Sequence, residues 1–222
     1  MTRTLKLIGA FACVLAAATT GAGLAWAAFV ATASNSGNSF QAASCFNMHR
    51  MATGSYTGDN ANGRAIATGF QPDLVIVKAD TTQIAIARTG SIAGDASKAL
   101  TGATNLVTNR IESLTSTGFT VGNNAQVNGN GTGYRWIAMR AGCAMTAGSY
   151  VGNGAASRTI SGAGFQPELV VLIPAAATQA SHRFAGMTRS FPFSSGTGTT
   201  TGVTGMAADG FTVGNSAEAN TE

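Results

Sequence analysis

The sequence predicts an all-β protein of two tandem β-sandwich or jelly-roll-like modules behind an N-terminal signal helix. The main observation is a ten-residue segment that occurs twice, as GFQPDLVIVK at 69–78 and as GFQPELVVLI at 164–173. Glycine and proline end any preceding helix, and the branched apolar run that follows predicts a strand buried on both faces. Phe70 and Phe165, beside the two turns, are each expected to close one end of a β core. No stretch after the leader shows sustained helical periodicity.

Further matches lie in the same order along the chain. Residues 54–58 match 148–152, and residues 118–123 match 210–215, at spacings of 92 to 95 residues. Ordered matches at nearly constant spacing indicate a tandem duplication. The sequence therefore predicts module one at 52–141 and module two at 142–222.

The strands of module one follow from alternation of apolar and polar residues between turn signals. They are expected at 55–57, 73–78, 83–88, 118–121 and 134–139. The stretch 90–100 is ambiguous and allows a short helix, whereas the Asn- and Gly-rich stretch 123–133 is expected to be a loop. Module two is expected to repeat this order with a longer hairpin tip, because 175–181 is small and polar.

The closing strand of module one has no expected counterpart in module two. At a spacing of 92 residues, strand 134–139 would recur at 226–231, which lies beyond Glu222. Module two is therefore expected to be incomplete at its C-terminus. Either the chain is a fragment of a longer protein, or another segment supplies the strand to an open β edge. The extended segment 29–42 is the spare candidate within this sequence.

Composition excludes some functions. The chain is 45% hydrophobic and only 10% charged, with 29 glycines and a formal net charge of +4. Low charge and abundant glycine suit short strands and many turns. Because no basic stripe is interleaved with aromatic residues, we do not expect nucleic-acid binding.

The N-terminus is predicted to be a secretion signal over residues 1–27. A positive start is followed by an uncharged apolar stretch and by Ala25-Trp26-Ala27, the small-x-small pattern that signal peptidases recognise. The alternative is an uncleaved membrane anchor, because 7–30 is long enough to span a bilayer. Residues 28–51 are then an extended segment or linker. Either way, the protein is expected to be extracellular or at the cell surface, and to touch the membrane only through an uncleaved N-terminal segment.

The stretch after the signal resembles the start of secreted bacterial proteins related to biofilm-matrix fibre subunits. The resemblance lies in the pattern AFxATxSNxGNxFxA over residues 28–42. It implies export and a fibre or matrix setting, and it implies no reaction.

Two cysteines remain outside the leader, which contains Cys13. Cys45 and Cys143 each precede one copy of the repeat, and two cysteines in an oxidising compartment often join. A Cys45–Cys143 disulfide would then link the starts of the two modules. The alternative is two unpaired buried thiols.

The repeat itself resembles a β-rich repeat of unknown function from phage tail, tail-fibre and other secreted surface proteins. The shared features, in order, are GFxPDxVxIK, an Arg-bearing segment such as 181–184, DGFTxG at 209–214 and NGxxYxWxA at 130–138. The resemblance implies a sandwich or jelly-roll-like module used for display or attachment, with no catalytic residues. Module one departs from the pattern, because it has Ala87-Arg88 where module two has His182-Arg183.

Candidate chemistry is sparse, so no enzyme activity, metal or cofactor is expected. The histidines are His49 and His182, and a Cys45-x-x-x-His49 pair has no second half at zinc spacing. A G-x-S-x-G nucleophile turn is absent. Asp73 and Glu168 occupy equivalent places, one per module, where a carboxylate can accept hydrogen bonds from backbone donors at the start of a strand. A glycosidase would instead need two facing carboxylates in one site.

Four residues are candidates for ligand contact: Tyr134, Trp136, His182 and Arg183. Tyr134 and Trp136 could form a platform on which a sugar stacks, or their alternating side chains could fill the core, which we favour. The function expected from the sequence is a secreted, non-catalytic structural or adhesive protein of the cell surface, the extracellular matrix or a phage-tail-like appendage. Its expected partners are copies of itself or other surface proteins, joined through β edges. The first alternative is a carbohydrate-binding module, whose partners would be glycans. A secreted hydrolase is a less favoured alternative.

Overall fold

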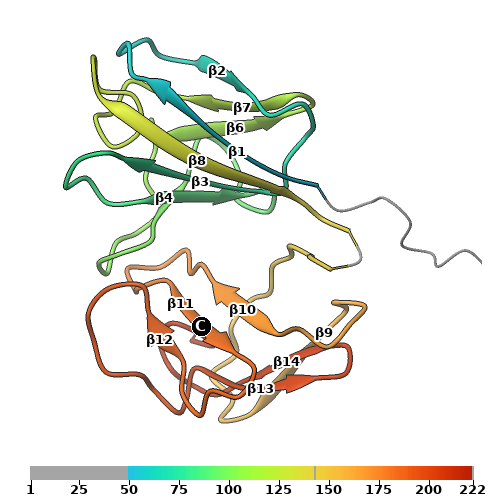
Figure 1. Cartoon of the computed structure of the whole chain (residues 1–222). Coiled ribbons are helices and arrows are strands. Elements are labelled where there is room, and N and C mark those ends of the chain that lie inside the picture. The colour runs from blue at the N-terminus through green and yellow to red at the C-terminus, as the bar shows by residue number, and fades with distance from the viewer. Residues whose placement is uncertain (1–49, 143, 222) are drawn as a thin grey trace, which may run out of the picture. The chain divides into compact units, whose positions relative to one another are not determined.

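The computed structural model describes residues 50–142 and 144–221 (Figure 1). The expected signal helix, segment 28–49 and both cysteines of the expected disulfide lie outside these residues. The described chain is all-β, and it contains no helix that is long and apolar enough to cross a membrane. Its strands are β1 (Arg50–Thr57), β2 (Arg64–Ala67), β3 (Leu74–Ala79), β4 (Ile86–Thr89), β5 (Lys98–Ala99), β6 (Ile111–Thr115), β7 (Gly118–Val121), β8 (Gly133–Arg140), β9 (Arg158–Ser161), β10 (Leu169–Leu172), β11 (Ser181–Phe184), β12 (Phe191–Pro192), β13 (Val203–Ala207) and β14 (Gly210–Val213).

Module one is a sandwich of two antiparallel sheets. The larger sheet has the strand order β1-β8-β3-β4-β5, and the smaller has the order β2-β7-β6. Val75 and Val77 of β3 belong to the same fully buried cluster as Phe119 and Val121 of β7. Since period-2 alternation sends every second side chain inward, two facing sheets together form one core.

Module two repeats most of this arrangement. Its sheets have the orders β10-β11-β12 and β13-β14-β9, so β9 to β14 correspond to β2 to β7. The β6–β7 pair has a register shift between Ile111 and Ser113, and the β13–β14 pair has one between Val203 and Gly205. Even this irregularity is therefore shared. Val170, Leu172, Val203, Val213 and Ala219 form the module's buried cluster.

Two strands of module one lack counterparts among the described residues of module two. β8 pairs with β1 on one side and with β3 on the other. In module two, β10 pairs only with β11, and residues 148–152, which correspond to part of β1, form no strand. The edge of β10 that corresponds to the β8-paired edge of β3 therefore has no strand partner within 144–221.

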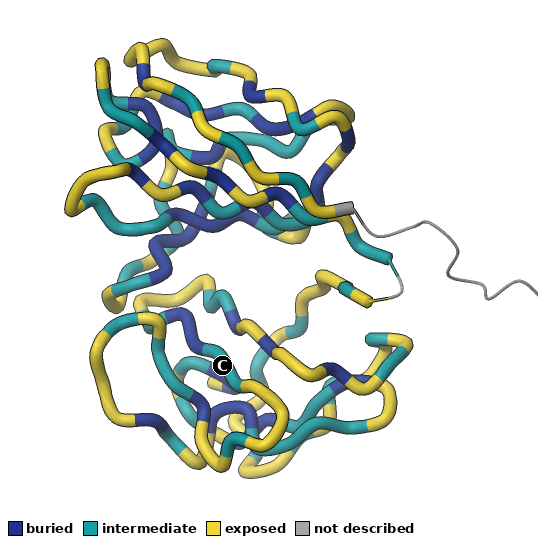
Figure 2. The backbone as a smooth tube through the Cα atoms, viewed as in Figure 1, coloured by how far each residue is buried: buried dark blue, intermediate teal, exposed yellow. Residues whose placement is uncertain are grey.

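The structure corrects three details of the sequence-based prediction. β3 was expected to be buried on both faces, but burial alternates along it (Figure 2). Val75 and Val77 are fully buried, Leu74 and Ile76 on the other face are only partly buried against a second apolar cluster, and Lys78 is exposed. The strand expected at 83–88 begins only at Ile86. Instead of a short helix, 90–100 contains turns and the short strand β5, because Arg88 holds these turns through their carbonyls, as described below.

Candidate functional site

Tyr134 and Trp136, two of the predicted ligand contacts, lie in the core of module one. Tyr134 is fully buried and Trp136 is 8% exposed. The Tyr134 hydroxyl donates to the Ala125 carbonyl at 2.7 Å, and its ring stacks on Tyr56 at a centroid distance of 5.1 Å. Rings held in this way present no face to a sugar, so the core interpretation fits both residues.

Arg183, the third candidate, donates hydrogen bonds to backbone carbonyls of its own module instead of being free to contact a ligand. Its Nη1 donates to the Val203 carbonyl and its Nη2 to the Met187 carbonyl, each at 2.6 Å. Guanidinium groups with several carbonyl partners organise loops, because five fixed N–H donors can satisfy several acceptors at once. A bound ligand would have to compete with these backbone acceptors.

Arg88 plays the same part in module one. Its guanidinium donates to the carbonyls of Ile92, Gly94, Ala96 and Ile111. Ile111 begins β6 and Val203 begins β13, so the two arginines reach equivalent points of the two modules. Burial lowers the pKa of Arg88 below its usual value, since the charged form loses water. Module one therefore keeps the arginine of the His-Arg pair, as Arg88, and differs from module two only at the histidine position, which is Ala87.

Replacing Arg88 by methionine is expected to lower the free energy of unfolding by about 2–3 kcal/mol, because several inward-facing carbonyls lose a charged donor. Chemical denaturation of the full chain measures this loss. Arg135→Met is the matched control, since Arg135 is largely exposed and its ion pair with Asp80 is worth about 0–1 kcal/mol. Equal losses in the two variants would show that Arg88 does not organise the loop.

Lys98 is a second buried cation with a structural role. It is fully buried, and its Nζ donates to the carbonyls of Thr104 and Ala176, the latter at 2.8 Å. Burial lowers its pKa below the usual value. Ala176 lies in the long hairpin tip between β10 and β11, so Lys98 fixes this tip through backbone oxygen.

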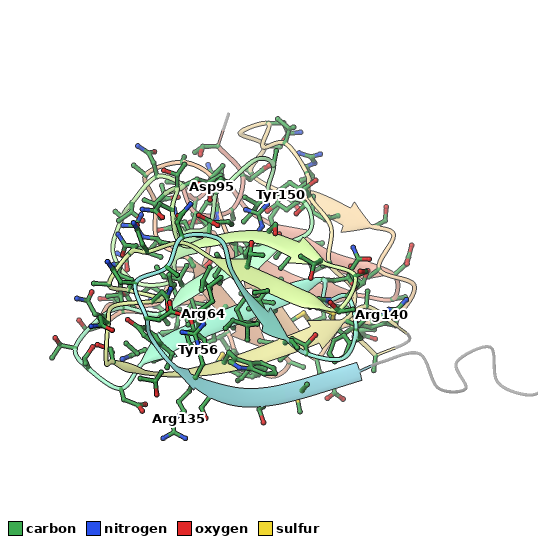
Figure 3. The ribbon with its side chains drawn as sticks, turned by 90° about the horizontal axis from the view of Figure 1, so that it is seen from above. Tyr56, Arg64, Asp95, Arg135, Arg140 and Tyr150 are labelled. Atoms are coloured by element: carbon green, nitrogen blue, oxygen red, sulfur yellow. The ribbon has the colours of Figure 1, made fainter. Side chains whose placement is uncertain are left out.

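The two Asn-rich loops of module one meet around Asn128. Its Nδ2 donates to Asp59 Oδ1 at 2.9 Å and to the Ala61 carbonyl at 2.8 Å. Figure 3 shows Tyr56 beside Arg64, whose guanidinium carbon lies 5.0 Å from the ring centroid. Burial raises the pKa of Tyr56 well above its ordinary value. Within 50–142 and 144–221, no three or more His, Cys, Asp or Glu side chains gather to hold a metal.

The carboxylates Asp73 and Glu168 do not form a pair. Asp73 Oδ2 accepts a hydrogen bond from the Ala141 N–H at 2.7 Å, which is the structural role expected at the start of a strand. Glu168 is exposed in the other module. A hollow of about 420 Å³ beside β8 contains one carboxylate, Asp80, whose Oδ2 lies 3.3 Å from Arg135 Nε. A two-carboxylate mechanism needs a second acid in the same hollow.

His182, the fourth candidate, lies within an exposed apolar face of module two. We define the apolar face as Leu169, Val171, His182, Phe184 and Phe193. The imidazole centroid is 5.5 Å from that of Phe184 and 4.8 Å from that of Phe193. Phe184 is 46% exposed and Phe193 is 37% exposed. Two rings thus flank the histidine and remain open to solvent.

Strand register assembles this face. Leu169 pairs with Phe184 and Val171 with His182, so the four side chains share one face of the β10–β11 ladder. Val170 and Leu172 point the other way, into the core. At the positions of His182 and Phe184, module one has Ala87, which is fully buried, and Thr89.

Sequence reasoning singled out His182 but missed the other members of the apolar face. The signal was present in the comparison of the two repeats, where small or polar residues of β4 are replaced by rings in β11. Its meaning depended on cross-strand register, which the sequence does not show directly.

Comparison with known proteins places only module one. Residues 47–149, which include β1 to β8, match the model of a family described as Domain of unknown function (DUF7483). No curated protein and no solved structure matches the chain.

Proposed function

We propose that the chain is a secreted, non-catalytic structural or adhesive β-module protein of the cell surface, the extracellular matrix or a phage-tail-like appendage. The observation that carries the proposal is the apolar face of module two. Apolar side chains that are gathered and exposed mark interaction surfaces more often than scattered ones do. Here Leu169 and Phe184, each 46% exposed, lie directly opposite one another beside the flanked His182.

Other features agree with a display role. The two modules follow one another in a single chain, and their sheets are stabilised by internal hydrogen bonds and cores. The buried cations Arg88 and Lys98 are occupied by carbonyls. Association therefore relies on faces and edges of sheets rather than on a reacting group.

Fractionation of producing cells tests the proposal. We expect the protein in the cell-surface or matrix fraction, and we expect the double variant Val171→Thr/Phe184→Thr to be released into the medium. The variant removes apolar contact area but leaves the buried Val170 and Leu172 unchanged. Its free energy of unfolding should therefore change by less than about 1 kcal/mol.

Ile137→Thr is the matched control, because Ile137 is 38% exposed on β8 of module one and lies outside the apolar face. Its distribution should equal that of the unaltered protein. Retention of all three proteins in the cytoplasm would refute export. Equal surface retention of the double variant and the control would refute the role of the apolar face.

A carbohydrate-binding module is the second candidate, favoured by the two exposed rings beside His182. Aromatic faces with a polar tip between them suit stacking on sugar rings. A glycan array probed with the full chain separates the candidates. Saturable binding lost in Phe184→Ala, and kept in Ile137→Ala, would favour this function over protein association.

A further inference from the structure

The duplication provides an internal comparison of module one with module two, whose described residues include no counterpart of β8. In module one, Trp136 of β8 lies opposite Gly54 of β1 and opposite Val77 of β3. The corresponding positions of module two are Gly148 and Leu172. No described strand lies between them, and the edge of β10 facing away from β11 has no strand partner within 144–221.

The space around Gly148 is empty where that around Gly54 is filled. A Cβ on Gly54 would lie 2.5 Å from the Trp136 ring, whereas a Cβ on Gly148 would have nothing within 4 Å. Neither glycine has a positive φ, so backbone conformation does not require glycine at these positions. At Gly54 the requirement is room for an indole ring. Gly148 preserves the same room without a ring among the described residues.

The aromatic neighbours of the absent ring are also present. Phe119 is fully buried, and its ring lies edge-on to Trp136 at 5.9 Å. Its counterpart Phe211 is only partly buried and lies edge-on to Tyr150 at 6.3 Å. Phe211 therefore has a face that an indole would cover.

The anchor for a second ring is preserved too. Tyr56, which stacks on Tyr134, donates its hydroxyl hydrogen bond to the Val127 carbonyl at 2.5 Å. Tyr150 makes the equivalent bond to the Ala219 carbonyl at 2.5 Å. Arg158 lies over the Tyr150 ring at 5.5 Å, as Arg64 lies over Tyr56. The contacts that hold Tyr150 in place are thus already formed, even though residues 148–152 form no strand.

We propose that module two is a strand acceptor, which binds an extended segment of a second polypeptide antiparallel to β10. The segment carries tyrosine and tryptophan two residues apart, with the tryptophan opposite Leu172 and over Gly148. Backbone hydrogen bonds to the open edge of β10 supply affinity. The space beside Gly148, Tyr150 and Phe211 accommodates the tryptophan and tyrosine of the added segment and so provides selectivity. Pro174 lacks an N–H, so the ladder ends near the tyrosine.

Among the described strands, β8 is already paired along both edges. It cannot complete module two without leaving module one. The acceptor role rests on the proposed function, since it names the kind of partner that an association module would bind. It uses the backbone edge of β10 and the core side of the sheet, where Leu172 lies, whereas the apolar face presents Leu169 and Val171 of the same strand on the opposite side.

A labelled peptide with the sequence of residues 128–140 tests the proposal against the full chain. We expect saturable binding by fluorescence anisotropy, and slower hydrogen exchange at the β10 amides when the peptide is bound. Peptides with Tyr134→Ala or Trp136→Ala should bind roughly tenfold more weakly, because each loses an aromatic contact. A peptide of the same composition in scrambled order should not bind.

Substitutions in the chain test whether the peptide binds beside Gly148. Gly148→Val should weaken peptide binding at least about tenfold, because its side chain fills the place of the indole. Gly90→Val is the matched control, since Gly90 also has nothing within 4 Å, has no positive φ and lies in module one. It should bind the peptide normally, and both variants should unfold like the unaltered chain.

Absence of saturable binding, or equal binding of the scrambled peptide, would overturn the proposal. So would a peptide that binds only when it is appended after Glu222 and never as a separate chain. Peptide binding by a protein that is never exported would support the acceptor and refute the proposed function. Surface retention without peptide binding would do the reverse.

Discussion

Replacing Trp136 by alanine is expected to lower the free energy of unfolding by about 3–5 kcal/mol, the usual cost of removing a buried aromatic ring. The indole packs edge-on to Phe119 and against Gly54, and it is only 8% exposed. Its loss leaves a cavity between the two sheets of module one, because the backbone of β8 stays paired with both neighbouring strands. The loss therefore includes both the burial of the ring and the cavity that remains.

Urea unfolding followed by circular dichroism measures this effect, since the substitution removes the fluorescent probe. Ile137→Ala is the control from the next position of β8, where the side chain points away from the core and is 38% exposed. Its loss should be below about 1.5 kcal/mol, in proportion to its partial burial. If Trp136→Ala unfolded as readily as Ile137→Ala, the indole would not be a core residue.

Phe70→Ala is expected to cost about 3–5 kcal/mol, whereas Phe165→Ala should cost less than about 2 kcal/mol. The two phenylalanines occupy the same place in the repeat, and the sequence alone predicts the same role for both. In the structure Phe70 is 6% exposed and belongs to the core of module one. Phe165 is only half-buried and lies outside the buried cluster of module two.

The same denaturation experiment compares the two variants with one matched substitution in each module. Because the modules unfold separately if they are weakly coupled, calorimetry should show which transition moves. Phe70→Ala should lower the transition of module one and leave the other unchanged. Equal losses for Phe70 and Phe165 would contradict the difference in burial.

The strand acceptor and the apolar face make different demands on a partner. The acceptor needs an extended backbone with two aromatic side chains on one face, and its selectivity depends on Gly148. The apolar face needs only contact area around His182. Variants at Gly148 and at Phe184 therefore separate strand addition from surface contact in the same binding assay.

Parts of the fold followed from local sequence signals. Glycine and proline before an apolar run predicted the position of β3 and of β10, and the repeated GFTV segment predicted β7 and β14. These signals act over a few residues, because turn chemistry and period-2 alternation are properties of neighbouring positions. The tandem order of the modules followed from the same repeats.

The candidate site could be predicted only in part. His182 was visible as an isolated histidine, but Leu169 and Phe184 meet it only through the pairing of β10 with β11. Arg183 carried the same signal as His182, yet its guanidinium binds the carbonyls of Met187 and Val203. Whether a polar side chain faces solvent or backbone depends on loops that the sequence does not orient.

By itself, the sequence determined the all-β class, the duplication and most strand positions. The tertiary structure alone decided which repeated residues are covered. Gly54 and Gly148 both begin the shared segment Gly-Ser-Tyr, but among the described residues only Gly54 lies under a tryptophan. The reason is physical: β8 joins strands that are distant in the chain, so its presence changes burial at positions that share a local sequence motif.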